Sequence, residues 1–189
     1  DDSSLSTPNR LNKGVISTKE FIKKELNMEM LFNFFQLSYR ASIIKENGVY
    51  FTPGVVYGED TEFALKALIY GSSIHISEEV TYFYVQRSDS AIRTTEFKRF
   101  DVIPLFENLA LFYRLNGKND LANLIIYSRI LKAIFGNMNY FFYSYYGFDN
   151  VMYVMKKKNL FSKLARYKGN DEKFKWKVRL FLLNPKLYY

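Results

Sequence analysis

The hydrophobic positions of residues 96–189 recur at the spacing of α-helices, whereas those of residues 1–95 mix helical with strand-like stretches. In the second half, apolar residues return every three or four positions, and this pattern predicts four helices, at 96–115, 119–145, 148–158 and 172–182. Short polar stretches rich in Gly, Asn and Asp separate them. The pattern therefore predicts a C-terminal region built of packed helices.

The first half has a different pattern, with two amphipathic helices and short β-prone stretches. Ser17 with Glu20 three residues later is typical of a capping box and predicts a helix over 17–26. A second helix is predicted over 59–70, and the segments expected to form a small sheet are 49–55 and 73–87.

The segments between these elements carry weaker signals. Residues 1–14 are rich in Ser, Asn, Asp and Pro and predict an irregular lead-in. Residues 29–48 are apolar on most sides, so we expect them to be buried and to end in a helix that stops at Gly48. The whole pattern predicts an α+β fold that is mostly helical, with a small sheet in 1–95 and a helical bundle in 96–189.

The cysteine and histidine content limits the kinds of catalytic and metal site that the chain can form. The chain has no cysteine and one histidine, His75. Disulfides, thiolate metal sites and a cysteine nucleophile are therefore excluded, and a single histidine makes neither a usual zinc site nor a histidine-paired nucleophile. Any acid–base chemistry in this chain has to rest mainly on carboxylates.

The positive charge is concentrated at the C-terminal end. Residues 1–126 hold 14 Lys and Arg against 16 Asp and Glu (net −2), whereas residues 127–189 hold 13 against 3 (net +10). Phe, Tyr and Leu lie between these cations, which indicates an anionic partner such as lipid headgroups. Nucleic acid is disfavoured, because the cations are interleaved with apolar residues and form no separate basic stripe.

The predicted helix 172–182 resembles an interfacial amphipathic helix, with cations around an apolar face. The candidates for contact with a membrane surface are Lys175, Trp176, Lys177, Arg179 and Phe181. The alternative is a helix packed on the rest of the protein, with lysine stems lying along the apolar surface.

Three acids at the start of the predicted helix 59–70 are the first candidates for chemistry. Glu59, Asp60 and Glu62 lie where acids complement the free amides and the positive end of the helix dipole. Residue types alone favour this capping role. A carboxylate fixed in the first turn of a helix beside a cleft is also well placed to take a proton from an attacking hydroxyl.

A polar loop after the predicted strands supplies the second group of candidates. Arg87, Ser90 and Arg93 in "QRSDSAIRT" offer guanidinium and hydroxyl groups that can bind phosphate oxygens. Surface loops often have this composition, so the loop alone is weak evidence for a phosphate site.

Taken in order, several of these motifs resemble the acceptor-side half of bacterial family 2 glycosyltransferases of the GT-A fold. The stretch "YRASIIKENGVYF" (39–51) precedes the Glu59–Asp60 pair at a helix start, and "YFY" (82–84) precedes Arg87 and "SAI" (90–92). The resemblance covers roughly residues 15–95, and the agreement in order and spacing is more specific than any one motif. It implies that 1–95 is the C-terminal part of a GT-A catalytic domain, followed by a variable helical region.

The resemblance implies a mechanism and a role for each matching residue. Asp60 would be the general base that deprotonates the acceptor hydroxyl, and Glu59 would support its geometry or contact the acceptor. Arg87 and Ser90 would lie near the donor diphosphate. The reaction implied is inverting transfer from a nucleotide sugar to a saccharide or lipid-linked acceptor, in capsular or other cell-surface polysaccharide synthesis.

The family's donor-binding half, with its Asp-x-Asp motif, does not match this chain. That motif would hold Mg²⁺ or Mn²⁺ in the full-length enzyme. Asp1 and Asp2 lack the apolar strand that precedes it, so we expect no metal ligands here and an isolated chain that is inactive. The location implied is cytoplasmic, with peripheral contact to the inner face of the plasma membrane as an option. The alternative function is a non-catalytic helical module for interaction or acceptor docking.

Overall fold

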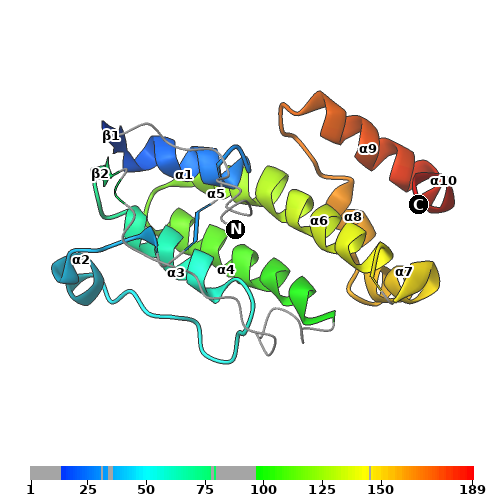
Figure 1. Cartoon of the computed structure of the whole chain (residues 1–189), viewed down its shortest axis with the longest axis horizontal. Helices are drawn as coiled ribbons and strands as arrows, with labels where there is room; N and C mark the ends of the chain where they lie inside the picture. The colour runs from blue at the N-terminus through cyan, green and yellow to red at the C-terminus, as the bar shows by residue number, and fades with distance from the viewer. Residues whose placement is uncertain (1–13, 31, 34–35, 78, 80–96, 145) are drawn as a thin grey trace, which may run out of the picture. The chain divides into compact units, whose positions relative to one another are not determined.

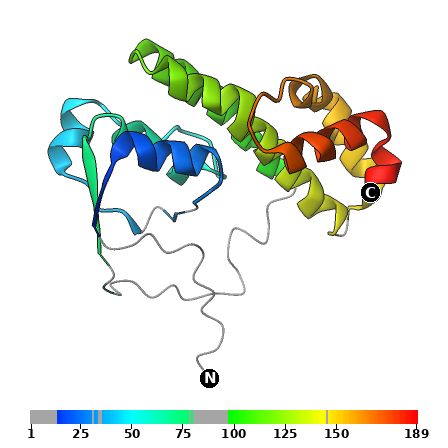
Figure 2. The same cartoon turned by 90° about the horizontal axis from the view of Figure 1, so that it is seen from above.

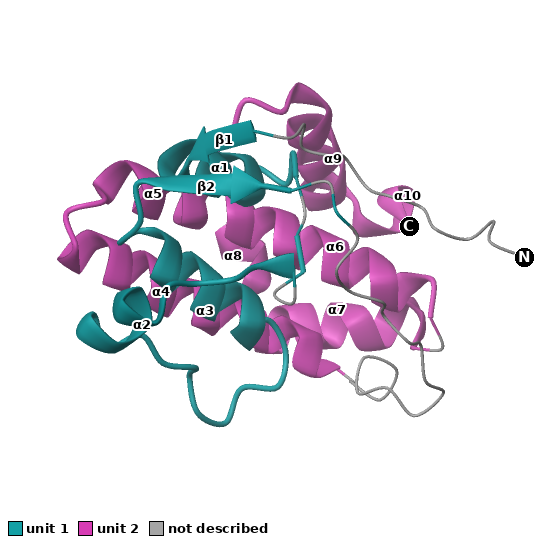
Figure 3. Cartoon of the chain, turned by 60° about the vertical axis from the view of Figure 1, so that its left-hand side comes forward, with its two compact units in different colours: residues 1–94 teal, residues 95–189 magenta. Residues whose placement is uncertain are grey.

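A two-stranded sheet and a larger set of helices make up the described part of the chain, which confirms the predicted α+β, mostly helical class (Figure 1). This computed structural model describes residues 14–30, 32–33, 36–77, 79, 97–144 and 146–189. The chain divides into two compact units, residues 1–94 and 95–189, which Figure 3 colours separately. The division lies one residue before the boundary expected from the sequence pattern.

The sheet of unit 1 pairs β1 (Gly14–Ser17) with β2 (Ser73–Ile76) in antiparallel register. β2 was predicted, but its partner was not. The strand predicted within 49–55 is wrong, because residues 49–52 pair with no strand in the described part of the chain. The chain then turns at Pro53 and Gly54, as the Pro-Gly pair predicts, and Gly54 takes a left-handed φ of 76°. Residues 80–87, the second part of the predicted segment 73–87, lie outside the described residues.

Two helices form the core of unit 1. In α1 (Thr18–Leu26) the Glu20 amide donates to the Ser17 hydroxyl at 3.1 Å, which confirms the predicted N-cap. The other core helix is α3 (Glu59–Leu68), also as predicted. Its apolar face and that of α1 supply most of the buried side chains of this unit: Phe21, Ile22 and Leu26 from α1, and Ala64, Leu65, Ala67 and Leu68 from α3.

The third helix of unit 1, α2 (Ala41–Glu46), has no buried residue. The expectation that the segment 29–48 is buried is therefore wrong for this helix. It has six residues, of which Ile43 and Ile44 are only partly exposed and the others lie in solvent. The helix does end as predicted, because Gly48 takes a left-handed φ of 57° directly after the C-cap residue Asn47.

Unit 2 is built entirely of helical segments within the described residues (Figure 2). The four predicted helices are confirmed, the second of them interrupted by a π-helical turn, and two short helices, α8 and α10, were not predicted. The segments are η3 (Phe97–Asp101), α4 (Val102–Leu115), α5 (Asn119–Leu124), η4 (Ile125–Arg129), α6 (Ile130–Phe142), α7 (Gly147–Lys157), α8 (Leu160–Leu164), α9 (Glu172–Leu183) and α10 (Pro185–Tyr188).

Aromatic rings fill the core of unit 2 where α9 packs. Phe181 of α9 is fully buried and meets the ring of Phe135 from α6 edge-on, with 5.7 Å between centroids. On its other side it stacks on Phe161 of α8 at 5.6 Å. Offset or edge-on ring pairs of this kind add to the free energy of burying the rings. α9 is therefore held on unit 2 by its Phe181 face.

No helix in the described part of the chain has the length and apolar character needed to cross a membrane.

Candidate functional site

The first turn of α3 places the three candidate acids in two different environments. The turn begins at Gly58, whose left-handed φ of 85° suits glycine and whose carbonyl accepts the Glu62 amide at 2.9 Å. Glu59 and Asp60 stay partly exposed, whereas the Glu62 side chain is fully buried. The acids that the sequence groups together are thus separated by burial.

Glu62 is engaged by two partners inside unit 1. The Thr52 hydroxyl lies 2.9 Å from one carboxylate oxygen and 2.7 Å from the other. Lys66, one turn further along α3, places its ammonium 2.6 Å from Oε1 and also donates to the Thr52 hydroxyl at 3.2 Å. A buried charge needs such partners to offset its lost hydration. Glu62 therefore joins α3 to the 49–54 segment and has no free oxygen for chemistry.

Asp60 has one carboxylate oxygen without a hydrogen bond among the residues that the structure describes. Its Oδ1 accepts the Thr61 amide at 2.6 Å and lies 3.3 Å from the Thr61 hydroxyl. Within the described residues Oδ2 accepts no hydrogen bond. One bonded oxygen orients the carboxylate and the other is left to accept a proton, which is the arrangement a general base requires.

Tyr39 lies close enough to Asp60 for the two groups to interact electrostatically. Burial, and secondly the negative charge of Asp60, raises the pKa of the Tyr39 hydroxyl to about 12. The hydroxyl oxygen is buried and has no hydrogen-bond partner in the described part of the chain. A buried donor left without a partner costs free energy.

A stack of rings lies on the same side of α3 as Asp60. Phe63, three residues after Asp60, is stacked on Phe51 with centroids 4.2 Å apart and meets Tyr39 edge-on at 5.8 Å. Phe51 is 49% exposed and its neighbour Tyr50 73%. The site thus combines a carboxylate with a free oxygen, an unsatisfied hydroxyl and open aromatic surface.

Of the site residues predicted in residues 1–95, Glu59 and Asp60 lie in this first turn. Arg87, Ser90 and Arg93 lie outside the described residues, so their assignment to a donor diphosphate stays a prediction.

The candidates on α9 divide into an exposed and a buried group. Trp176, Lys177 and Arg179 are exposed and Lys175 is partly so. Phe181 was wrongly predicted as a membrane contact, because it is fully buried among the rings of α6 and α8. For this face the alternative of a helix packed on the protein is confirmed.

Several residues of the site were not recognised in the sequence. Tyr39 and Phe51 are the first and last residues of the matching motif, but nothing in their spacing indicates that the rings of both contact the ring of Phe63. The Glu62–Lys66 pair has the i, i+4 spacing that could have identified it. The contact of Glu62 with Thr52 has no such signal, because it bridges an irregular segment.

The described residues contain no cluster of acidic and histidine side chains that could hold a metal ion. Asp1 and Asp2 lie outside them. No protein-family model, no curated protein and no solved structure matches the chain. The resemblance to family 2 glycosyltransferases therefore rests on the sequence motifs and stays a prediction.

Proposed function

We propose that this chain is the acceptor-side portion of an inverting, nucleotide-sugar-dependent glycosyltransferase of cell-surface polysaccharide synthesis. The observation that carries the proposal is the contrast between Asp60 and Glu62. Glu62 is fully engaged by Thr52 and Lys66, whereas Asp60 presents a free oxygen beside the ring stack. Of these two acids, Asp60 is the one with an oxygen left for proton transfer. The choice of Asp60 over the partly exposed Glu59 rests on the sequence motif.

In this proposal the acceptor sugar lies on the exposed ring surface of Phe51 and Tyr50 with one hydroxyl directed at Asp60. Aromatic rings offer a flat apolar surface that suits the C–H face of a sugar ring. Asp60 Oδ2 then accepts the proton of the attacking hydroxyl as that oxygen bonds to the anomeric carbon of the donor sugar and the nucleotide diphosphate leaves from the opposite face.

The donor side belongs to the full-length enzyme. Arg87 and Ser90 are proposed to contact the donor diphosphate, and Mg²⁺ or Mn²⁺ would be held by a motif that this chain does not match. A cytoplasmic location, at the inner face of the plasma membrane where lipid-linked acceptors are found, is part of the same proposal.

The test is the rate of sugar transfer by a full-length enzyme carrying Asp60→Asn. Loss of a general base lowers the rate by about 10²–10⁴-fold, and the change from carboxylate to amide keeps the shape of the side chain. Glu59→Gln is the matched control, since it changes the neighbouring acid of the same turn, and we expect a smaller loss. A wild-type rate for Asp60→Asn would contradict the proposal and favour a non-catalytic acceptor-docking module.

A further inference from the structure

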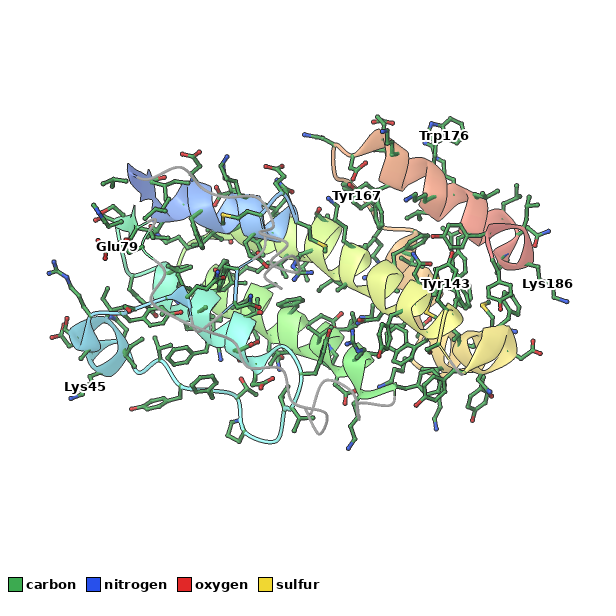
Figure 4. The ribbon with its side chains drawn as sticks, in the orientation of Figure 1. Lys45, Glu79, Tyr143, Tyr167, Trp176 and Lys186 are labelled. Carbon is green, nitrogen blue, oxygen red and sulfur yellow. The ribbon has the colours of Figure 1, made fainter. Side chains whose placement is uncertain are left out.

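The side of α9 that faces away from the core of unit 2 carries a second apolar row. Trp176, Leu180 and Leu183 are spaced four and three residues apart, which places them on one face of a helix of 3.6 residues per turn. Trp176 is 66% exposed and Leu183 83%. Figure 4 shows Trp176 pointing away from the ribbon of unit 2. We call these three residues the outer row.

The buried face of the same helix shows that the outer row is not needed to hold α9 in place. Val178 and Phe181 are buried on the opposite side, and Phe174 meets the ring of Phe135 at 5.2 Å. A helix anchored by one apolar face usually presents a polar face to water. The outer row is therefore apolar surface that the fold of unit 2 leaves uncovered.

Cations flank the outer row on both sides. At 100° per residue Lys173 and Lys177 lie on one side of the row, and Lys175 and Arg179 on the other. The guanidinium of Arg179 lies 5.4 Å from the centre of the Trp176 ring. The one acid of the helix, Glu172, is paired with Lys175. Lys173, Lys177 and Arg179 have no acidic partner in the described part of the chain.

We propose that the outer row of α9 docks on an anionic lipid surface, with the helix lying parallel to the membrane plane. Trp176, Leu180 and Leu183 would enter the boundary between headgroups and acyl chains, and the flanking cations would contact the lipid phosphates. Charge complementarity favours this occupant over a second copy of the chain, whose outer row would bring the same four cations against its own. Tryptophan in particular favours the headgroup region. The inference shares the membrane location with the proposed function, but its test involves neither Asp60 nor a sugar, so either can fail without the other.

The chain has a single tryptophan, so its fluorescence reports on the outer row alone. The 189-residue chain is titrated with vesicles of equal parts phosphatidylcholine and phosphatidylglycerol, and with vesicles of phosphatidylcholine only. We expect a blue shift of the Trp176 emission on the anionic vesicles, quenching by brominated acyl chains, and release at high salt.

Two variants separate the apolar from the electrostatic contribution. Leu183→Ser and the double variant Lys173→Gln/Lys177→Gln each lower partition onto anionic vesicles by roughly tenfold. Leu115→Ser is the matched control, because Leu115 is a leucine of similar exposure on α4, and its partition stays at the wild-type value. Circular dichroism shows whether each variant is folded.

Three results would overturn the inference. The first is equal partition onto neutral and anionic vesicles. The second is binding without a blue shift or without an effect of Leu183→Ser, which means contact through charge alone. The third is a blue shift that grows with protein concentration when no vesicles are present, which assigns the outer row to a second copy of the chain.

Discussion

The helices α3 and α9 both carry charged residues beside an apolar face, but they place their charges differently. α3 takes a carboxylate, Glu62, into the core of unit 1 and surrounds it with Thr52 and Lys66. α9 buries only apolar side chains such as Val178 and Phe181, and its cations stay at the surface. In both helices the packed face contacts other residues of its own unit. The residues that we propose for contact with a partner are Asp60 on α3 and the outer row on α9.

This comparison gives a rule for choosing functional candidates on an amphipathic helix. In both helices the most regular pattern in the sequence is engaged within the folded unit. On α9 this pattern is an apolar face, and on α3 it is a charged pair at i, i+4. Function is better sought in what remains: a carboxylate with a free oxygen, or a second apolar row that the core does not cover.

The largest expected effect on stability comes from removing the ring that anchors α9. Phe181→Ala should lower the free energy of unfolding of unit 2 by about 3–5 kcal/mol, since it removes a fully buried ring and leaves a cavity. Leu183→Ala on the outer row should change it by less than about 0.5 kcal/mol. Urea unfolding followed by Trp176 fluorescence measures both. Equal losses would show that the two faces of α9 are not distinct.

A smaller effect is expected from the buried carboxylate of α3. Glu62→Ala should cost about 3 kcal/mol, because it leaves Lys66 and the Thr52 hydroxyl without their partner in a buried setting. Adding Lys66→Met should recover part of this loss, with a coupling of about 0.5–3 kcal/mol in a double-mutant cycle. Glu59→Ala is the control, with a loss of about 0.3–1 kcal/mol from the helix dipole. Additive effects of Glu62 and Lys66 would contradict the pairing.

The smallest effect concerns the unsatisfied hydroxyl near Asp60. Tyr39→Phe removes a buried donor that has no partner in the described part of the chain, so the variant should be as stable as the wild type or about 1 kcal/mol more stable. A loss of several kcal/mol would show that the hydroxyl has a structural partner. Chemical unfolding at neutral pH distinguishes the two outcomes.

The raised pKa of the Tyr39 hydroxyl predicts that the free energy of unfolding falls at alkaline pH. Its pKa is raised from 10.0 to about 12 in the folded protein by burial and by Asp60. As the pH rises, the unfolded chain therefore releases this proton first. The contribution to stability is complete below pH 10 and is lost between pH 10 and 12. In Tyr39→Phe the fall of stability over this range should be shallower, which unfolding curves at several alkaline pH values would reveal.

Much of the helical architecture follows from local sequence. The caps at Ser17 and Gly48 and the apolar spacing in α3, α4, α7 and α9 are properties of a few neighbouring residues. The pairing of β1 with β2 could not be predicted in this way, because about 60 residues separate the two strands and nothing local specifies the partner.

The candidate site was predictable only in part. The order of the motifs selected Asp60, but all three acids in its turn satisfy the same capping rule, and only the burial of Glu62 separates them. On α9 the apolar period correctly identified a face. That face is where Phe181 packs. The outer row of Trp176, Leu180 and Leu183 was not recognised, because the apolar spacing of the Phe181 face is more regular.

The central claim is that Asp60 serves chemistry and Glu62 serves the fold. The measurement that tests it most directly is the rate of sugar transfer by full-length Asp60→Asn and Glu62→Gln enzymes, each expressed per folded molecule. We expect Asp60→Asn to lose about 10²–10⁴-fold in rate with wild-type stability, and Glu62→Gln to lose stability while its folded molecules keep a rate close to the wild type. A wild-type rate for Asp60→Asn, or a comparable loss of rate in folded Glu62→Gln, would contradict the claim.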